Sequence, residues 1–261
     1  MSEIIRLENV CLDKYGKRIL DGISLSISCG ECCGLIGANG SGKSSLLSLI
    51  SGYDWASEGS IWFCGERYGE INIPEVRKEI GLLSLSRTPE FSKNLTVFEL
   101  IKTGVTGTIM PALWLKSEDR RASQKAEELL AEYEMQHFKS RRLATLSTGE
   151  MMKTLLLRAV AGEPKLLLLD EPASGLDIFN RALILDFIKR LNNGKRAIMT
   201  VTHHLEELPD SLDSVTVLKS GREVITGCPE EVLKDSVLSE AFACRVEVVK
   251  IGSRYLANAS L

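Results

Sequence analysis

Apolar residues along this chain follow two periods, one typical of strands and one typical of helices. Residues 4–11 and 19–27 alternate apolar and polar positions on either side of a turn at 14–17, which predicts two antiparallel strands. A further hairpin-like stretch lies between glycines at 59–65. The N-terminal part is therefore expected to form an antiparallel sheet.

Several short apolar runs predict strands that are buried on both faces. The clearest contains four consecutive leucines at 166–169, as expected for a parallel sheet covered by helices. Similar runs occupy residues 31–36, 80–86 and 197–202, and a late hairpin is predicted at 215–225. These runs predict an α/β core.

Apolar positions at helical spacing predict helices between the strands. Residues 45–52, 154–161 and 181–191 are expected to be helices of the core. A helix is also expected after Thr96, a candidate cap with a glutamate three residues on, and another at 117–138.

The alternation of these elements predicts three parts. Residues 1–88 and 155–230 are expected to form the core with its antiparallel sheet, and residues 89–154 an inserted helical subdomain. Residues 231–261 are expected to be a C-terminal extension that ends in a small strand pair.

A glycine-rich stretch between a predicted strand and a predicted helix matches the pattern G-x-x-x-x-G-K-[ST] at every constrained position. Its residues are Gly37, Ala38, Asn39, Gly40, Ser41, Gly42, Lys43 and Ser44. Such a loop turns backbone N–H groups toward an anion at a helix N-terminus, where the helix dipole also favours negative charge. We therefore predict that the loop binds phosphate groups of a nucleotide, with Lys43 on the β- and γ-phosphates and the Ser44 hydroxyl on Mg²⁺.

Two carboxylates follow the leucine-rich strand. Asp170 is placed at the carboxyl edge of the parallel sheet, where open α/β folds bind ligands, and is expected to hold Mg²⁺. Glu171 is expected to orient and deprotonate a water that attacks the γ-phosphate. Taken alone, the pair could equally cap a helix after a strand.

Composition limits the remaining functions. The net charge is −3, which gives no electrostatic reason to expect nucleic-acid binding. No apolar run approaches the roughly 18 residues of a membrane span, so a cytoplasmic protein is expected, able to dock on the inner face of the cell membrane. Cys32 and Cys33 are expected to be buried in a strand rather than to bind a metal.

Together, these motifs resemble the ATP-binding subunit of an ABC transporter, from about Ile5 to about Gly227. The resemblance rests further on residues 146–150, similar to the family's LSGGQ signature, on residues 174–177, the D-loop, and on His203, the switch histidine. Residues 146–150 and 201–207 look like a branch linked to molybdate uptake. The resemblance implies a P-loop NTPase with a RecA-like core.

The resemblance also implies roles for individual residues. Tyr15 would stack on adenine, although it could be a plain surface aromatic, and residues 37–45, including Ser45, would surround the phosphates. Ser147 and Gly149 would contact the γ-phosphate bound to the opposite subunit. His203 would sense the γ-phosphate; His204 is its rival, but adjacent strand-end residues are expected to point oppositely.

Capping is the alternative for two of these residues, since Ser147 and Asp177 could simply cap the helices that follow. One chain has one phosphate loop and one signature. A second copy or a paralogue is therefore expected to complete an ATP sandwich whose opening and closing moves membrane-spanning subunits. The alternative function is a soluble ABC-type ATPase that acts as a regulator or on a macromolecular complex.

One position departs from the family. Where the family usually carries a glutamine that touches Mg²⁺ and the attacking water, the register gives Leu85, which can do neither. Ser84 or Ser86 could substitute through water if the register differs by one residue. We therefore expect slow basal hydrolysis with ordinary ATP binding.

Overall fold

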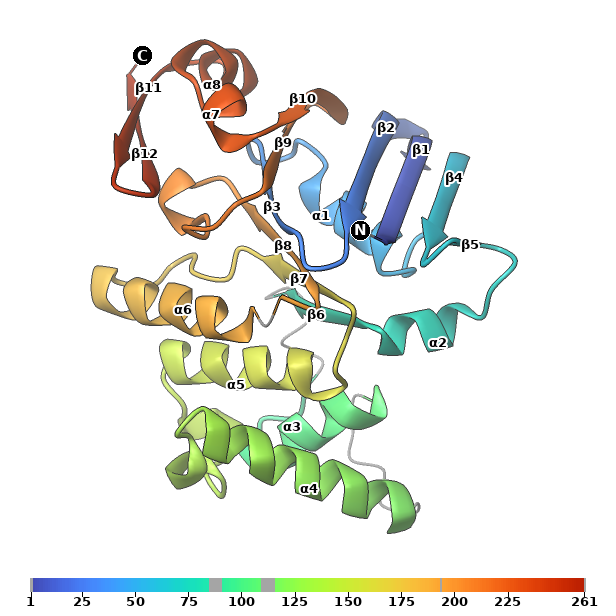
Figure 1. Ribbon diagram of the computed structural model, residues 1–261, viewed down its shortest axis with the longest axis vertical. Coiled ribbons are helices and arrows are strands. Elements are labelled where there is room, and N and C mark those ends of the chain that lie inside the picture. The colour runs from blue at the N-terminus through green and yellow to red at the C-terminus, as the bar shows by residue number, and fades with distance from the viewer. Residues whose placement is uncertain (1, 85–90, 109–115, 193, 261) are drawn as a thin grey trace.

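The computed structural model describes residues 2–84, 91–108, 116–192 and 194–260. Figure 1 shows an antiparallel sheet beside a central sheet, a stack of helices on one side of the central sheet, and a C-terminal hairpin at the far end. The predicted α/β class with an antiparallel N-terminal sheet and a helical region is confirmed.

The N-terminal sheet is antiparallel and has the order β2-β1-β4-β5. Alternation of buried and exposed residues along its strands explains why it forms, because one face packs on the core and the other faces water. Its strands are β1 (Glu3–Lys14), β2 (Lys17–Ser28), β4 (Glu58–Phe63) and β5 (Glu66–Arg67).

The central sheet has the order β10-β9-β3-β8-β7-β6 and is parallel except for β10. All four leucines of the leucine-rich run are fully buried, as predicted. Cys32 and Cys33 are also buried, and burial raises the pKa of Cys32 to about 12. The strands are β3 (Cys32–Ile36), β6 (Ile80–Ser84), β7 (Leu166–Asp170), β8 (Ala197–Thr202), β9 (Ser214–Lys219) and β10 (Arg222–Gly227).

Helices cover both faces of the central sheet. One face packs with the N-terminal sheet and α1, and the other packs on a core shared by α3, α4, α5 and α6. The helices are α1 (Lys43–Ile50), α2 (Ile73–Lys78), α3 (Val97–Thr106), α4 (Lys116–Glu132), α5 (Thr148–Ala161), α6 (Ile178–Leu191), α7 (Pro229–Val232) and α8 (Asp235–Phe242).

Two predicted helix starts are confirmed by capping boxes. The Thr96 hydroxyl accepts from the Glu99 N–H at the start of α3, and the Ser147 hydroxyl accepts from the Glu150 N–H at the start of α5. Helix α5 crosses the expected boundary near residue 154 without a break. The division into three parts therefore stays a proposal.

The helix predicted at 117–138 is shorter than expected. Helix α4 ends at Glu132, and a separate 3₁₀ turn spans Gln136–Phe138. Between them Glu134 has a left-handed backbone with φ of 59°, which an α-helix cannot contain. The expected C-terminal strand pair is present as β11 (Arg245–Ile251) and β12 (Arg254–Ser260).

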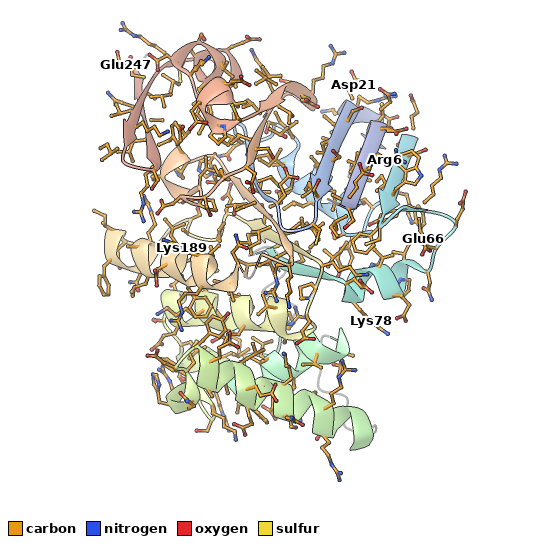
Figure 2. The ribbon with its side chains drawn as sticks, viewed as in Figure 1. Arg6, Asp21, Glu66, Lys78, Lys189 and Glu247 are labelled. Carbon is orange, nitrogen blue, oxygen red and sulfur yellow. The ribbon has the colours of Figure 1, made fainter. Side chains whose placement is uncertain are left out.

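Charged side chains of both signs are spread over the molecule. Figure 2 labels Asp21 on β2, Glu66 on β5, Lys78 on α2, Lys189 on α6 and Glu247 on β11, which lie on different sides of the fold. Within the described ranges, none of the helices combines the length and the apolar character that a membrane span requires.

Helices α3 and α5 pack closely because α3 has a glycine at the contact. A Cβ added at Gly104 would lie 2.0 Å from the Arg158 carbonyl oxygen of α5. We predict that Gly104→Ala lowers the free energy of unfolding by about 1–3 kcal/mol, since the helices must separate. Equilibrium urea unfolding measures this, with Glu128→Ala on the exposed face of α4 as control, expected within about 0.5 kcal/mol. Equal stability of the two variants would contradict the close packing.

Candidate functional site

The candidate site lies where the parallel strands end at a common edge. Ile36 at the end of β3 pairs with Thr202 at the end of β8, and Asp170 at the end of β7 pairs with Val201. Ser84, the last residue of β6, pairs with Asp170. The register therefore brings the loop after β3, the carboxylates after β7 and the histidines after β8 to one edge.

The glycine-rich loop is held tightly against strand β9. A Cβ added at Gly37 would lie 2.3 Å from the Leu218 carbonyl oxygen and 2.5 Å from the Ser41 hydroxyl. Gly42, the residue before α1, has a φ of 106°, which side chains rarely adopt. The buried Ser41 hydroxyl has no hydrogen-bond partner among the residues that the structure describes. Glycine is thus required at both ends of the loop, and the loop retains unused hydrogen-bonding capacity.

Lys43 is 6% exposed and lies over this loop. Its ammonium donates to the Gly37 carbonyl at 2.7 Å and to the Ala38 carbonyl at 3.1 Å. Burial lowers the pKa of Lys43, while the nearby Glu171 and Asp170 oppose that shift. The cation is therefore poorly solvated and is available to an anion that displaces the carbonyls.

Asp170 is partly buried among polar groups. Burial raises the pKa of this carboxyl, and the hydroxyl of Ser84, which donates to Oδ2 at 3.2 Å, opposes that rise. A hydrogen bond from Ser44 also lowers it, so Ser44 and Asp170 lie within contact of one another. A hydroxyl and a carboxylate side by side are the oxygen ligands that Mg²⁺ prefers, and this donor set fits that ion.

Glu171 has an unusual backbone and a defined side-chain partner. Its φ is 50°, in the left-handed region that non-glycine residues seldom adopt, and its N–H donates to the Val201 carbonyl at 2.8 Å. Its Oε1 lies 2.8 Å from Nδ1 of His203. The bond to Val201 holds this strained backbone at the sheet edge, and the carboxylate contacts His203.

The expectation that His203 and His204 point oppositely is wrong. Their ring centroids lie 4.0 Å apart. Strand β8 already ends at Thr202, so the alternation of a strand no longer applies to the two histidines. Even so, His203 is the one that contacts Glu171.

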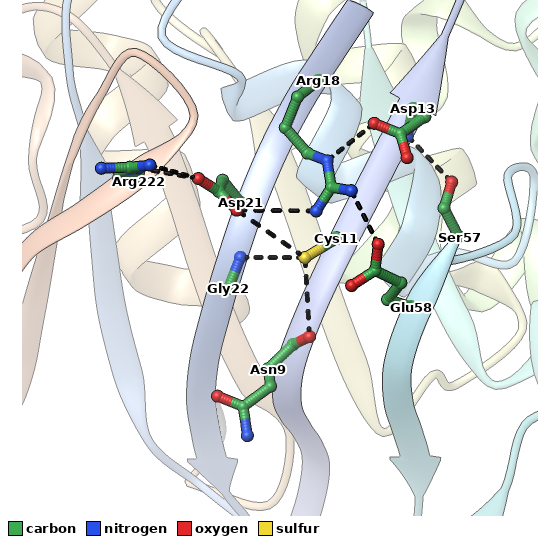
Figure 3. A network of polar contacts seen from close by, with 9 residues as sticks. All are labelled: Asn9, Cys11, Asp13, Arg18, Asp21, Gly22, Ser57, Glu58 and Arg222. Atoms are coloured by element: carbon green, nitrogen blue, oxygen red, sulfur yellow. Dashed lines mark hydrogen bonds and ion pairs between the residues drawn. The ribbon is translucent and has the colours of Figure 1, made fainter.

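Tyr15 lies at the tip of the β1–β2 turn and is fully exposed. A polar network behind this turn, shown in Figure 3, ties the N-terminal sheet to the central sheet. Arg18 contacts Asp13, Asp21 and Glu58, and Asp21 also contacts Arg222 of β10. The Gly221 N–H donates to the Ser41 carbonyl, so the same connection reaches the glycine-rich loop.

Ser147, Gly149 and Asp177 form a second cluster. Asp177 caps α6, its carboxylate accepting from the Asn180 N–H at 2.8 Å. A Cβ added at Gly149 would lie 2.9 Å from the Asn180 side-chain oxygen, so the starts of α5 and α6 are adjacent. Among the hydrogen bonds of the described ranges, none joins these three residues to the loop 37–45.

Other site residues are placed as follows. Ser45 lies in the first turn of α1, directly after Ser44. Leu85 and Ser86 lie outside the described residues, so the expectation for this position stays a prediction. Ser84 is expected from the sequence only as a substitute for the family glutamine, whereas its hydroxyl in fact contacts Asp170. That contact depends on the pairing of β6 with β7, which no local pattern reveals.

Comparisons with known proteins agree with this geometry. Residues 20–174 match the family model described as ABC transporter. The chain is similar to the lipoprotein-releasing system ATP-binding protein LolD of Aquifex aeolicus, with 35% identity over 86% of this chain and 97% of that protein.

Two solved structures show the same fold. An ATP-binding cassette of an ABC transporter in its ADP conformation superposes with a TM-score of 0.77 and 26% identity over 91% of this chain and 96% of that one. A dimeric cassette in a post-hydrolysis state with ADP and Pi superposes with a TM-score of 0.71 and 23% identity, over 86% and 98%. The chain therefore belongs to the ABC transporter family, as an ATP-binding subunit that hydrolyses ATP.

Proposed function

We propose that the ATP-hydrolysing site of this chain is completed by a second copy or a paralogue, and that hydrolysis drives transport by membrane-spanning partner subunits. The observation that carries the proposal is the separation of two half-sites in one chain. Lys43, Asp170 and Glu171 lie together at the sheet edge, whereas Ser147 and Gly149 lie at the start of α5 with no hydrogen bond to the loop 37–45, within the described ranges.

The glycine-rich loop is proposed to bind the phosphates. Its backbone amides and the N-terminus of α1 supply donors and a favourable dipole. Lys43 already hydrogen-bonds to the carbonyls of the loop, so nucleotide binding exchanges these bonds for charge-assisted bonds to phosphate oxygens. Tyr15, exposed at its turn, is proposed to stack on the adenine.

Ser44 and Asp170 are proposed to hold Mg²⁺, which neutralises charge on the phosphate oxygens when bound. Asp170 must be ionised for this role. The Ser84 hydroxyl favours the ionised form and opposes the effect of burial.

Glu171 is proposed to accept a proton from the attacking water. His203 holds its Oε1, which leaves the other carboxylate oxygen for the water. Ser147 and Gly149 are proposed to complete the site of the other subunit, because the start of α5 presents a hydroxyl, free amides and the positive end of a helix dipole. Asp177 is proposed to lie at the same interface.

A groove along β6, the edge strand of the central sheet, is proposed to bind the membrane partner. Its volume is about 490 Å³, and it lies between α2, β6, α3 and α5. Its lining combines aromatic, aliphatic and cationic side chains, among them Tyr53, Arg77, Leu82, Phe91 and Arg158. This mixture suits an amphipathic helix of a partner protein. The chain would then work at the inner, cytoplasmic face of the cell membrane.

The finer assignment to the branch linked to molybdate uptake rests on residues 146–150 and 201–207 alone. It stays a prediction about the transported substrate.

Glu171→Gln tests the proposed base. The amide keeps the shape of the side chain but cannot take a proton, so we expect ATP to bind while the hydrolysis rate falls about 10²-fold or more. With Mg-ATP, the variant should elute from size exclusion as a dimer. A variant that stays monomeric with bound ATP would contradict the shared site.

Lys43→Ala tests the phosphate loop. Loss of the buried ammonium should weaken ATP binding and abolish turnover, because nothing else in the loop neutralises the β- and γ-phosphates. The exposed Lys17 provides the matched control, and Lys17→Ala should leave the ATPase rate nearly unchanged. An unchanged rate in Lys43→Ala would remove the loop assignment.

Co-purification from detergent-solubilised membranes tests the groove. A protein with several membrane spans should co-purify with the chain, and Arg77→Glu should abolish this because it reverses a charge in the groove. Lys189→Glu on α6, outside the groove, should retain the partner. If no membrane protein co-purifies with the unaltered chain, the alternative of a soluble ABC-type ATPase is favoured.

A further inference from the structure

The turn after β8 is held by two fully buried polar side chains. Thr202 and Glu207 are each 0% exposed. The Thr202 hydroxyl lies 2.6 Å from Oε2 of Glu207 and 3.0 Å from the His204 amide nitrogen. The amide can only donate, so the hydroxyl accepts from His204 and gives its single proton to Glu207.

The backbone closes the same turn. The Glu207 N–H donates to the His204 carbonyl at 3.2 Å, within the 3₁₀ turn Leu205–Glu207. Glu207 therefore binds the turn from two sides, through its own backbone and through its carboxyl group. Both sets of bonds meet at His204.

Glu207 is expected to lower the stability of the fold at this buried position. Its other oxygen, Oε1, is buried and has no hydrogen-bond partner within the described ranges. A buried carboxyl group with one unsatisfied oxygen is destabilising compared with an apolar side chain of similar size. A destabilising buried group beside a catalytic site is expected where its hydrogen bonds position neighbouring residues.

The turn carries His203, which lies in the sequence between Thr202 and His204, the two residues joined by this hydrogen bond. His203 reaches Glu171 at 2.8 Å. We infer that Thr202 and Glu207 are positioning residues for ATP hydrolysis, because their hydrogen bonds fix the backbone that aims His203 at Glu171. This inference rests on the proposed roles of Glu171 and His203.

The same strand supplies a matched control. Thr200 lies two residues before Thr202, on the same face of β8, and is also 0% exposed. In the part of the chain that the structure describes, its hydroxyl has no hydrogen-bond partner. A threonine-to-valine change therefore has the same size and burial at both positions, but only at 202 does it remove the bonds to the turn.

The experiment compares steady-state ATPase kinetics of Thr202→Val, Thr202→Ser and Thr200→Val. We expect kcat to fall about ten-fold in Thr202→Val with KM nearly unchanged, since a displaced His203 affects the reaction more than binding. Thr200→Val should stay within about two-fold of the unaltered chain, and Thr202→Ser, which keeps the hydroxyl, should regain most of the rate. Equal rates in the two valine variants would overturn the inference.

A double-mutant cycle separates positioning from general damage. If Thr202 acts through His203, adding Thr202→Val to His203→Ala should slow the enzyme no further. Effects that multiply would overturn the inference. If His203→Ala alone leaves kcat unchanged, the proposed role of His203 is wrong and the inference falls with it. If kcat falls in His203→Ala but is unchanged in Thr202→Val, the inference about Thr202 is refuted while the proposed role of His203 stands.

Discussion

The register of the parallel strands is the constraint on which the site depends. The pairs Ile36 with Thr202, Asp170 with Val201 and Ser84 with Asp170 end the four strands at nearly one level. A slip of one residue would turn each side chain to the opposite face of the sheet. The four leucines of β7 do not themselves oppose such a slip, because the strand is buried and apolar on both faces. A slip would instead misplace the polar residue at the end of the strand. Register therefore couples the stability of the sheet to the geometry of the edge.

The edge concentrates polar groups that are hard to bury. Lys43 and Asp170 have opposite charges and opposite pKa shifts, and each partly offsets the burial of the other. Lys43 donates hydrogen bonds to the carbonyls of its own loop. Anion binding exchanges these bonds for new ones, and because Lys43 is already buried it does not require a free lysine to be desolvated and ordered. The strained backbone of Glu171 is held by its bond to Val201, again at the strand ends.

Sequence patterns predict the parts of this fold that are determined locally. The buried leucines, the glycine-rich loop and the capping boxes at Thr96 and Ser147 each follow from residues within a few positions of one another. The contacts of Ser84 with Asp170 and of Asp21 with Arg222 join strands far apart in the sequence, so no window of sequence shows them. The side-by-side histidines were missed for a different reason, because the exact residue at which β8 ends decides whether strand alternation applies.

Ser147 can cap its helix and contact a nucleotide at the same time, whereas for Asp177 the two roles compete for the same carboxylate. The Ser147 hydroxyl is the acceptor in its bond to the Glu150 N–H, so its proton remains available to a phosphate oxygen of another subunit. Both carboxylate oxygens of Asp177 accept from Asn180, from its N–H and from its side-chain amide, and these bonds lower the pKa of Asp177. A carboxylate that stays ionised repels phosphate. We therefore infer that Ser147 meets the nucleotide of the partner, whereas Asp177 acts through the start of α6, which lies beside Gly149.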